Sequence, residues 1–150
     1  MPVTRKLLWI LFWALVGGFV LLYPIMISMY VYLPLFIGFA GYMIIWGIEG
    51  HGVRYIWFPL FYLLNLEANL SLPMFLSLFA ILLFYLTLYE KIRYFKRCSL
   101  CVGLLSVVAI DIYYVVLLLG YDFMFDTSSI FINTLLFYSL LSDLIFVVLL

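Results

Sequence analysis

Two carboxylates lie inside apolar stretches, where an ionised group is costly. Asp111 stands in the run Val-Val-Ala-Ile-Asp-Ile, and Asp143 stands in Leu-Leu-Ser-Asp-Leu. An aspartate at the centre of a membrane helix costs roughly 2.5 to 3.5 kcal/mol, so such residues normally face other helices or water and have a partner. They could therefore form a site for an ion, a proton or a substrate. They could equally form a polar clamp between helices, with a carboxyl that is protonated. The clamp is favoured because no further acids cluster around them.

A second motif is the CxxC sequence formed by Cys98 and Cys101. This spacing serves both thiol redox chemistry and half of a zinc site. Zinc needs four ligands, and the chain has no other cysteine and a single histidine. A membrane thiol oxidase of the DsbB or vitamin K epoxide reductase kind would need a second cysteine pair. We therefore expect two reduced, dispensable thiols and no metal or cofactor site.

The segment from Gly47 to Arg54, Gly-Ile-Glu-Gly-His-Gly-Val-Arg, has the glycines of a phosphate cradle around His51. It has no Lys-Ser/Thr step leading from a strand into a helix, so a tight turn between two helices is the better interpretation. Arg54 is long enough to neutralise Asp143 across the bundle. The alternative is that Arg54 reaches lipid phosphate while Asp143 bonds to a Ser or Tyr hydroxyl.

Composition indicates which elements must position these residues. Hydrophobic residues make up 70% of the 150 residues and charged residues 9%, against about 25% charged in a typical soluble domain. The missing charge indicates a lipid environment and a single all-α integral membrane domain spanning residues 1–150. The zero net charge leaves no basic surface for nucleic acid. The basic start before Leu7 is typical of a signal peptide, but no cleavage site follows, so we expect a retained first helix.

Polar and helix-breaking residues divide the chain into six apolar segments, and no internal repeat is evident. The predicted helices are Leu7–Leu22, Pro34–Ile48, Tyr55–Leu64, Met74–Tyr89, Leu100–Leu119 and Ile130–Leu150. If all six cross the membrane with the N-terminus inside, every cation lies on the cytoplasmic side: Arg5, Lys6, Arg54, Lys91, Arg93, Lys96 and Arg97. The positive-inside rule therefore predicts a bundle of six transmembrane helices with both termini in the cytoplasm. The basic stretch at 91–97 fixes this topology and could also bind anionic lipid headgroups.

Helical rise then predicts the depth of the two aspartates. At 1.5 Å per residue, Asp111 lies roughly 18 Å above the cytoplasmic end of its helix and Asp143 about 10 Å above the same face. The two carboxyls are accordingly not expected to share one site.

From Pro34 onward the order of features resembles the MreD family, the small membrane subunit of the bacterial rod-shape machinery. Four local motifs carry the resemblance: the helix start Leu33-Pro-Leu, the acidic turn Leu64-Asn-Leu-Glu-Ala-Asn-Leu-Ser-Leu-Pro73, the basic aromatic loop Tyr89 to Arg97, and the helix segment Leu104-Leu-Ser-Val-Val-Ala-Ile-Asp111. The resemblance implies a non-catalytic scaffold in the bacterial inner membrane. It would bind the protein MreC and work beside a RodA-type glycosyltransferase and its penicillin-binding partner.

The same resemblance implies a fold like that of the substrate-binding subunits of energy-coupling-factor transporters, which supplies the alternative function. Such a subunit would bind a small ligand from outside, at a shallow pocket lined by Asn65, Glu67, Asn69, Asp122 and Asp126. On either interpretation no catalytic residue is expected. The residues expected to hold the structure or a partner are Arg54, Glu67, Asp111 and Asp143.

Overall fold

The computed structural model describes residues 2–30, 33–94, 98–126 and 135–149. Within these ranges the regular structure is entirely helical. The elements are α1 (Pro2–Met29), α2 (Ile37–Trp46) with the π-helical turn η1 (Gly47–His51), α3 (Arg54–Asn69), α4 (Leu76–Phe84) with η2 (Tyr85–Tyr89) and α5 (Glu90–Arg93), α6 (Ser99–Phe125), and α7 (Leu135–Leu149). Because η1 extends α2, and η2 and α5 extend α4, the described chain forms six helical rods, one for each predicted segment.

Among the described residues, two helices are long and apolar enough to cross a membrane by length and composition. They run over Arg5–Met29 and Leu100–Phe125. The third rod, predicted over Tyr55–Leu64, is longer than predicted and runs from Arg54 to Asn69. The start of the sixth predicted segment, residues 130–134, lies outside the described residues, as does Leu150.

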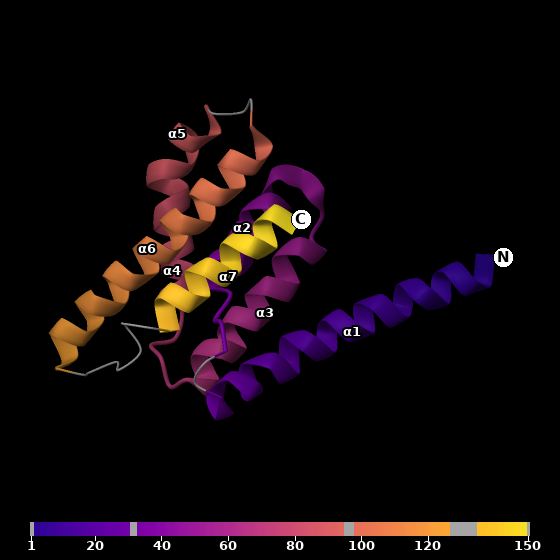
Figure 1. Cartoon of the computed structure of the whole chain (residues 1–150), viewed down its shortest axis with the longest axis horizontal. Helices are drawn as coiled ribbons and strands as arrows, with labels where there is room; N and C mark the ends of the chain where they lie inside the picture. Colours follow the sequence, from indigo (N-terminus) through magenta and orange to yellow (C-terminus); the bar gives the residue numbers. More distant parts are fainter. Residues whose placement is uncertain (1, 31–32, 95–97, 127–134, 150) are drawn as a thin grey trace.

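Helix α2 occupies the middle of the bundle. It packs against α3, α4, α6 and α7, while α4 and α7 each pack on α6 (Figure 1). Its sequence is apolar with small residues, so it has no polar face to turn towards water. The core is built from side chains on all of these helices, including Ile37, Ile44, Ile45, Leu63, Leu66, Ala80, Phe84, Ile110 and Tyr114.

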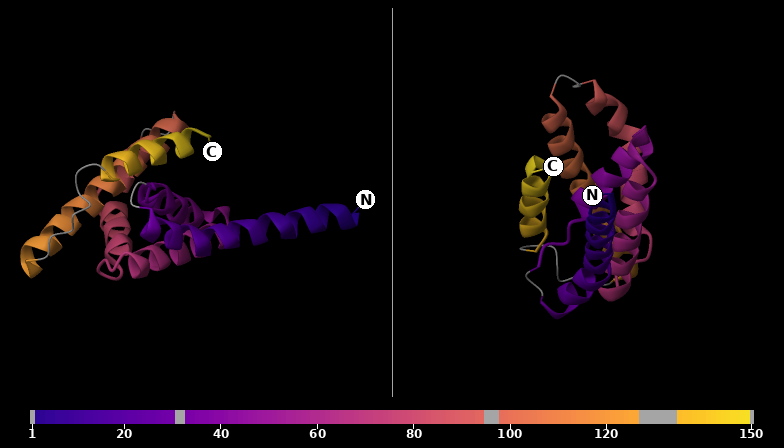
Figure 2. Two further views of the ribbon diagram at one scale, coloured as in Figure 1. Left: turned by 60° about the horizontal axis from the view of Figure 1, so that its bottom comes forward. Right: turned by 90° about the vertical axis from the view of Figure 1, so that its right-hand side faces the viewer.

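Helix α1 joins this core only through its C-terminal half, where Val20 and Ile27 are buried. It packs along α3, and its N-terminal half extends beyond the other helices (Figures 1 and 2). Only 11% of its most apolar stretch is buried. Leu8, Leu11 and Leu15 are each more than half exposed. This half of α1 therefore presents a large apolar surface that the rest of the described chain does not cover.

Two of the helices begin with the same local design. Leu33-Pro-Leu-Phe36 precedes α2 and Leu72-Pro-Met-Phe75 precedes α4. The phenylalanine before each helix has a left-handed backbone, with φ of 50° at Phe36 and 69° at Phe75. Two residues further on stands a small residue, Gly38 or Ser77. The same short motif, Leu-Pro-x-Phe, therefore precedes both helices.

The glycine-rich turn between α2 and α3 has the role expected of it. Gly50 has φ 104° and Gly52 has φ 127°, both in the region that glycine adopts without steric cost. His51 bonds through Nδ1 to the carbonyl oxygen of Trp46 at 3.1 Å and stacks on the Trp46 ring. The turn is thus closed by its own side chains.

Candidate functional site

The first turn of α4 is capped by an acid from the preceding helix. The first backbone N–H groups of a helix have no partner within that helix. The carboxylate of Glu67, at the end of α3, accepts the N–H of Phe75 at 2.7 Å and the N–H of Ser77 at 2.6 Å. Glu67 is 1% exposed. Glu67 therefore caps the positive end of α4 from within the protein.

The first turn of α2 is capped by the last described helix. Ser139 and Asp143 lie one turn apart on α7. Ser139 Oγ accepts the N–H of Leu35 at 3.2 Å, and Asp143 Oδ2 accepts the N–H of Gly38 at 2.9 Å. Both side chains are buried, and Asp143 is 0% exposed. The start of α2 lies inside the protein, so these two groups replace the water that would otherwise solvate it.

The carbonyl groups of the same segment are also satisfied. Tyr23 on α1 donates its hydroxyl to the carbonyl oxygen of Pro34 at 3.0 Å, and Tyr62 on α3 donates to that of Leu35 at 2.8 Å. Side chains from three helices therefore fix the extended segment that leads into α2.

Asp111 on α6 closes the site from the other side. A Cβ atom added to Gly38 would lie 2.8 Å from both oxygens of Asp111 and 2.8 Å from a methyl group of Val107. Only a glycine lets α2 approach α6 this closely. Asp111 is 7% exposed, and it lies within electrostatic range of Asp143. We call Gly38, Asp111 and Asp143 the Asp–Gly–Asp site.

The expectation that the two aspartates do not share a site is wrong. A Cβ on Gly103 of α6 would lie 2.9 Å from Val147 of α7, so these residues are level with each other. Counting along the antiparallel helices, Asp143 is then opposite Val107, about 6 Å along the axis from Asp111 at 1.5 Å per residue. Because each Cα–Cβ bond leans towards its own helix N-terminus, the two side chains lean towards each other. This offset is close to the one expected from helical rise; that expectation left out the lean of the side chains and the position of Gly38 beside both acids.

The predicted ion pair between Arg54 and Asp143 is also wrong. The guanidinium of Arg54 lies 4.4 Å from the ring centroid of Trp9 and 5.4 Å from that of Trp13, both on α1. Such cation–π contacts are a common use of arginine beside tryptophan. Arg54 is exposed at the start of α3, whereas Asp143 is buried at the start of α2. The two residues therefore serve different contacts.

The Asp–Gly–Asp site has two buried oxygens without a hydrogen-bond partner, Oδ2 of Asp111 and Oδ1 of Asp143. Within the described residues, no Lys, Arg or His forms an ion pair with either carboxyl; the ion pair present, Arg93 with Glu49 at 3.7 Å, is at the surface. No group of three or more His, Cys, Asp or Glu side chains in the described ranges could hold a metal ion. The site is thus a pair of acids at a helix N-terminus without a compensating cation.

The two cysteines form a disulfide in this structure, so the expectation of reduced thiols is wrong here. Cys98 precedes α6, and its Sγ accepts the N–H of Cys101 at 3.2 Å. The sulfur of Cys98 therefore caps α6 as well as joining that of Cys101. The Cys-x-x-Cys spacing, which brings the two side chains together at a helix N-terminus, is a sufficient reason for the bond.

The polar residues suggested for an outer ligand pocket bond mainly within the protein. Asn65 donates to the carbonyl oxygens of Val20 and Leu21 on α1 at 3.3 and 3.1 Å, and Asn69 donates to Asn65 at 2.8 Å. Together with the buried Glu67, they connect helices. The structure does not bring them to one cavity.

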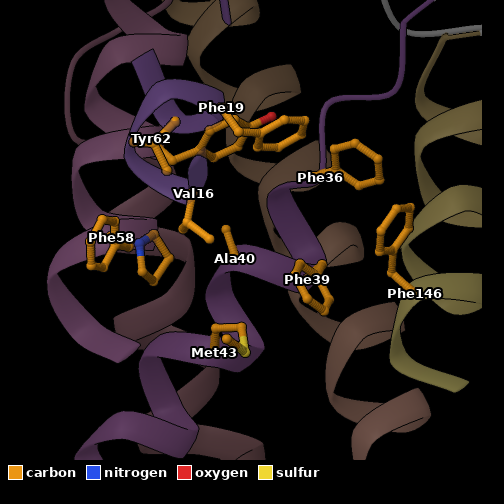
Figure 3. Close-up of a pocket in the computed structure, with 11 residues that line it drawn as sticks. Val16, Phe19, Phe36, Phe39, Ala40, Met43, Phe58, Tyr62 and Phe146 are labelled. Atoms are coloured by element: carbon orange, nitrogen blue, oxygen red, sulfur yellow. The ribbon is translucent and has the colours of Figure 1, made fainter. Parts of the chain in front are cut away.

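The described residues also line a partly open apolar cavity of about 160 Å³ between α1, α2, α3 and α7. Figure 3 shows Val16 and Phe19 from α1, Phe39, Ala40 and Met43 from α2, and Phe146 from α7 around it. No charged side chain lines it. Its walls suit only an apolar occupant.

The sequence pointed to the acids but did not identify Gly38 as their partner, and it gave no indication of Ser139. The repeated Leu-Pro-x-Phe start, with a small residue two positions later, was the signal available for Gly38. No local signal marks Ser139 beyond its position one turn before Asp143.

Comparison with known proteins gives no match: no family model, no curated protein and no solved structure is similar to this chain.

Proposed function

We propose that this protein is a non-catalytic scaffold subunit of a bacterial peptidoglycan elongation complex, with six helices in the inner membrane and both termini in the cytoplasm. In this role it binds a MreC-like protein and works beside a RodA-type synthase. The proposal rests on the resemblance of its motifs to the MreD family. It also rests on the exposed apolar half of α1, which is the observation that carries a binding role.

The length of uncovered helix argues for a protein partner on α1. Arg54 and Trp9 tie the helix to the start of α3, yet Leu8, Leu11 and Leu15 remain exposed. Helices in a membrane associate through packing between their surfaces. A single membrane-spanning helix of the partner, lying along α1, would cover these side chains.

The buried acids connect neighbouring helices, which supports a scaffold role. Glu67 and Asp143 each hold the first turn of a neighbouring helix, and such contacts stabilise an arrangement of helices. The fold is consistent with the cytoplasmic side proposed from charge. Arg54 lies beside Trp9 near the start of α1, and Arg93 lies beside Glu49 in η1.

Site-specific photo-crosslinking tests this function. A photoreactive residue at Leu11, exposed on α1, should crosslink to the MreC-like partner in membranes. The same residue at Leu119, exposed on α6, is the matched control and should not. Crosslinks to lipid alone at Leu11, together with failure of the two proteins to co-purify in mild detergent, would exclude the scaffold role.

The alternative is a small-ligand-binding membrane subunit of an energy-coupling-factor transporter. One observation favours it, the cavity between α1, α2, α3 and α7, whose apolar walls would select an apolar ligand. Co-purification with a pair of ATPases, and loss of ligand binding when Ala40→Phe fills the cavity, would favour transport over the scaffold.

A further inference from the structure

We infer that the Asp–Gly–Asp site is a proton-binding site, in which Asp111 and Asp143 hold a single proton between Asp111 Oδ2 and Asp143 Oδ1. This inference concerns the interior of the bundle and does not depend on which partner binds at α1.

The two buried carboxyls have no neutralising charge beside them. Both carboxyls are at least nine-tenths buried, and no cation of the described chain pairs with them. Two like charges close together in a low-dielectric interior cannot both stay ionised, and such pairs share a proton. The pair therefore carries one negative charge instead of two.

The single negative charge of the pair lies on Asp143. Asp143 Oδ2 accepts the N–H of Gly38 at the N-terminus of α2, which is the positive end of that helix. The oxygens of Asp111 also lie against Gly38 and near its N–H, but Asp143 is reached in addition by the N–H of Phe39. The negative charge is best stabilised on Asp143, so the proton belongs to Asp111.

A shared proton also completes the hydrogen bonding of the site. Among the carboxyl oxygens of the two aspartates, Asp111 Oδ2 and Asp143 Oδ1 are the buried ones without a partner. An O–H on Asp111 that donates to Asp143 satisfies both with one proton, because a protonated carboxyl donates and an ionised one accepts. The other titratable groups facing this region are Tyr23 and Tyr62, and each donates its hydroxyl to a backbone carbonyl instead.

The shared proton gives the site a function. It lets α2, α6 and α7 pack together, because the pair of acids then carries one negative charge instead of two. Removing it would leave two facing carboxylates beside Gly38 and would push α6 from α7. The contact between these helices is therefore sensitive to proton release.

Infrared spectroscopy of the purified protein with isotope-labelled aspartate tests this assignment at neutral pH. The wild type should show the C=O band of a protonated aspartic acid, which shifts in heavy water. Asp111→Asn should abolish the band yet keep the fold, because the amide still donates to Asp143. Glu67→Gln is the matched control: it alters a buried helix cap without a second acid, and should leave the band unchanged.

Two results would overturn the proposal. One is the absence of the band from the wild type at neutral pH. The other is thermal stabilisation by sodium over choline that disappears in Asp111→Asn, since a bound cation would then occupy the site. The infrared band of the wild type and its response to pH remain decisive if a variant fails to fold. Raising the pH until the band disappears should also lower the unfolding temperature.

Discussion

Glu67 Oε1 accepts the backbone N–H of Ser77 at 2.6 Å, across the turn between α3 and α4. The turn is closed further by the left-handed Ser71, with φ 53°, and by a bond from the N–H of Leu72 to the carbonyl oxygen of Glu67 at 3.0 Å. One acidic residue therefore ends one helix through its backbone and starts the next through its side chain.

Replacing Glu67 by alanine should destabilise the protein by about 1 to 3 kcal/mol per N–H left unpaired, because two buried donors lose their acceptor. Glu67→Gln should cost less, since the amide oxygen can still accept one bond. Thermal unfolding in detergent measures both losses. Equal losses for the two variants would contradict this role, because alanine would then lose nothing that glutamine keeps.

Gly38→Ala should be severely destabilising, because the new Cβ would lie 2.8 Å from Asp111 and Val107. Overpacking of this kind typically costs about 1 to 3 kcal/mol. Gly18→Ala is the control, since a Cβ there meets nothing within 4 Å, and alanine favours the helix by about 1 kcal/mol. The unfolding temperature should fall for the first variant and stay level or rise for the second.

Loss of the Arg54 guanidinium should weaken the packing of α1 against the start of α3. Cation–π contacts are worth about 0.5 to 1 kcal/mol at exposed sites, so Arg54→Gln and Trp9→Leu should each lower stability by this order. In the double variant the losses should be less than additive, because both remove the same contact. Strict additivity in unfolding measurements would show that the two side chains do not interact.

Replacing Cys98 and Cys101 together by serine should have little effect on the bundle. The disulfide closes a loop of only a few residues, for which the loss of chain entropy corresponds to under about 2 kcal/mol. The serine hydroxyl at position 98 can still cap α6 by accepting the backbone N–H of residue 101. Stability, and crosslinking from Leu11, should stay near wild type; loss of that crosslink would assign the pair a redox role.

The six-span topology predicts which side each connection faces. Alkaline phosphatase fused after Asn69 or after Asp126 should be active, because the enzyme works outside the cytoplasm, and a fusion after Lys96 should be inactive. Activity after Lys96 would reverse the orientation of the intervening helices.

The number and order of helices could be predicted from the sequence, because apolar runs and the polar residues between them are local signals. The predicted start of the second helix at Pro34 is three residues earlier than α2 itself, whose first residue is Ile37. Glu67 was expected to hold the structure or a partner, but its role as a cap was not predicted, because its partners Phe75 and Ser77 belong to the start of the next helix.

The partners of Asp143 were not predictable in the same way. Its bond to Gly38 joins residues 105 apart in the sequence, and it depends on the register between α2 and α7. Helical rise alone does not fix that register. Arg54 was assigned to the wrong partner for a related reason: charge suggested an acid, while the exposed position of Arg54 beside α1 favoured two aromatic rings.

The two capped helix starts differ in when they can be completed during synthesis. The donor groups at the start of α4 find Glu67, which the ribosome has already delivered. Those at the start of α2 must wait for Ser139 and Asp143, which emerge about a hundred residues later, at separations of 104 and 105. Until α7 is translated, the nascent chain carries an unfinished helix end in its interior. A polypeptide truncated before α7 would accordingly expose this defect to cellular quality control, although its first five rods were complete.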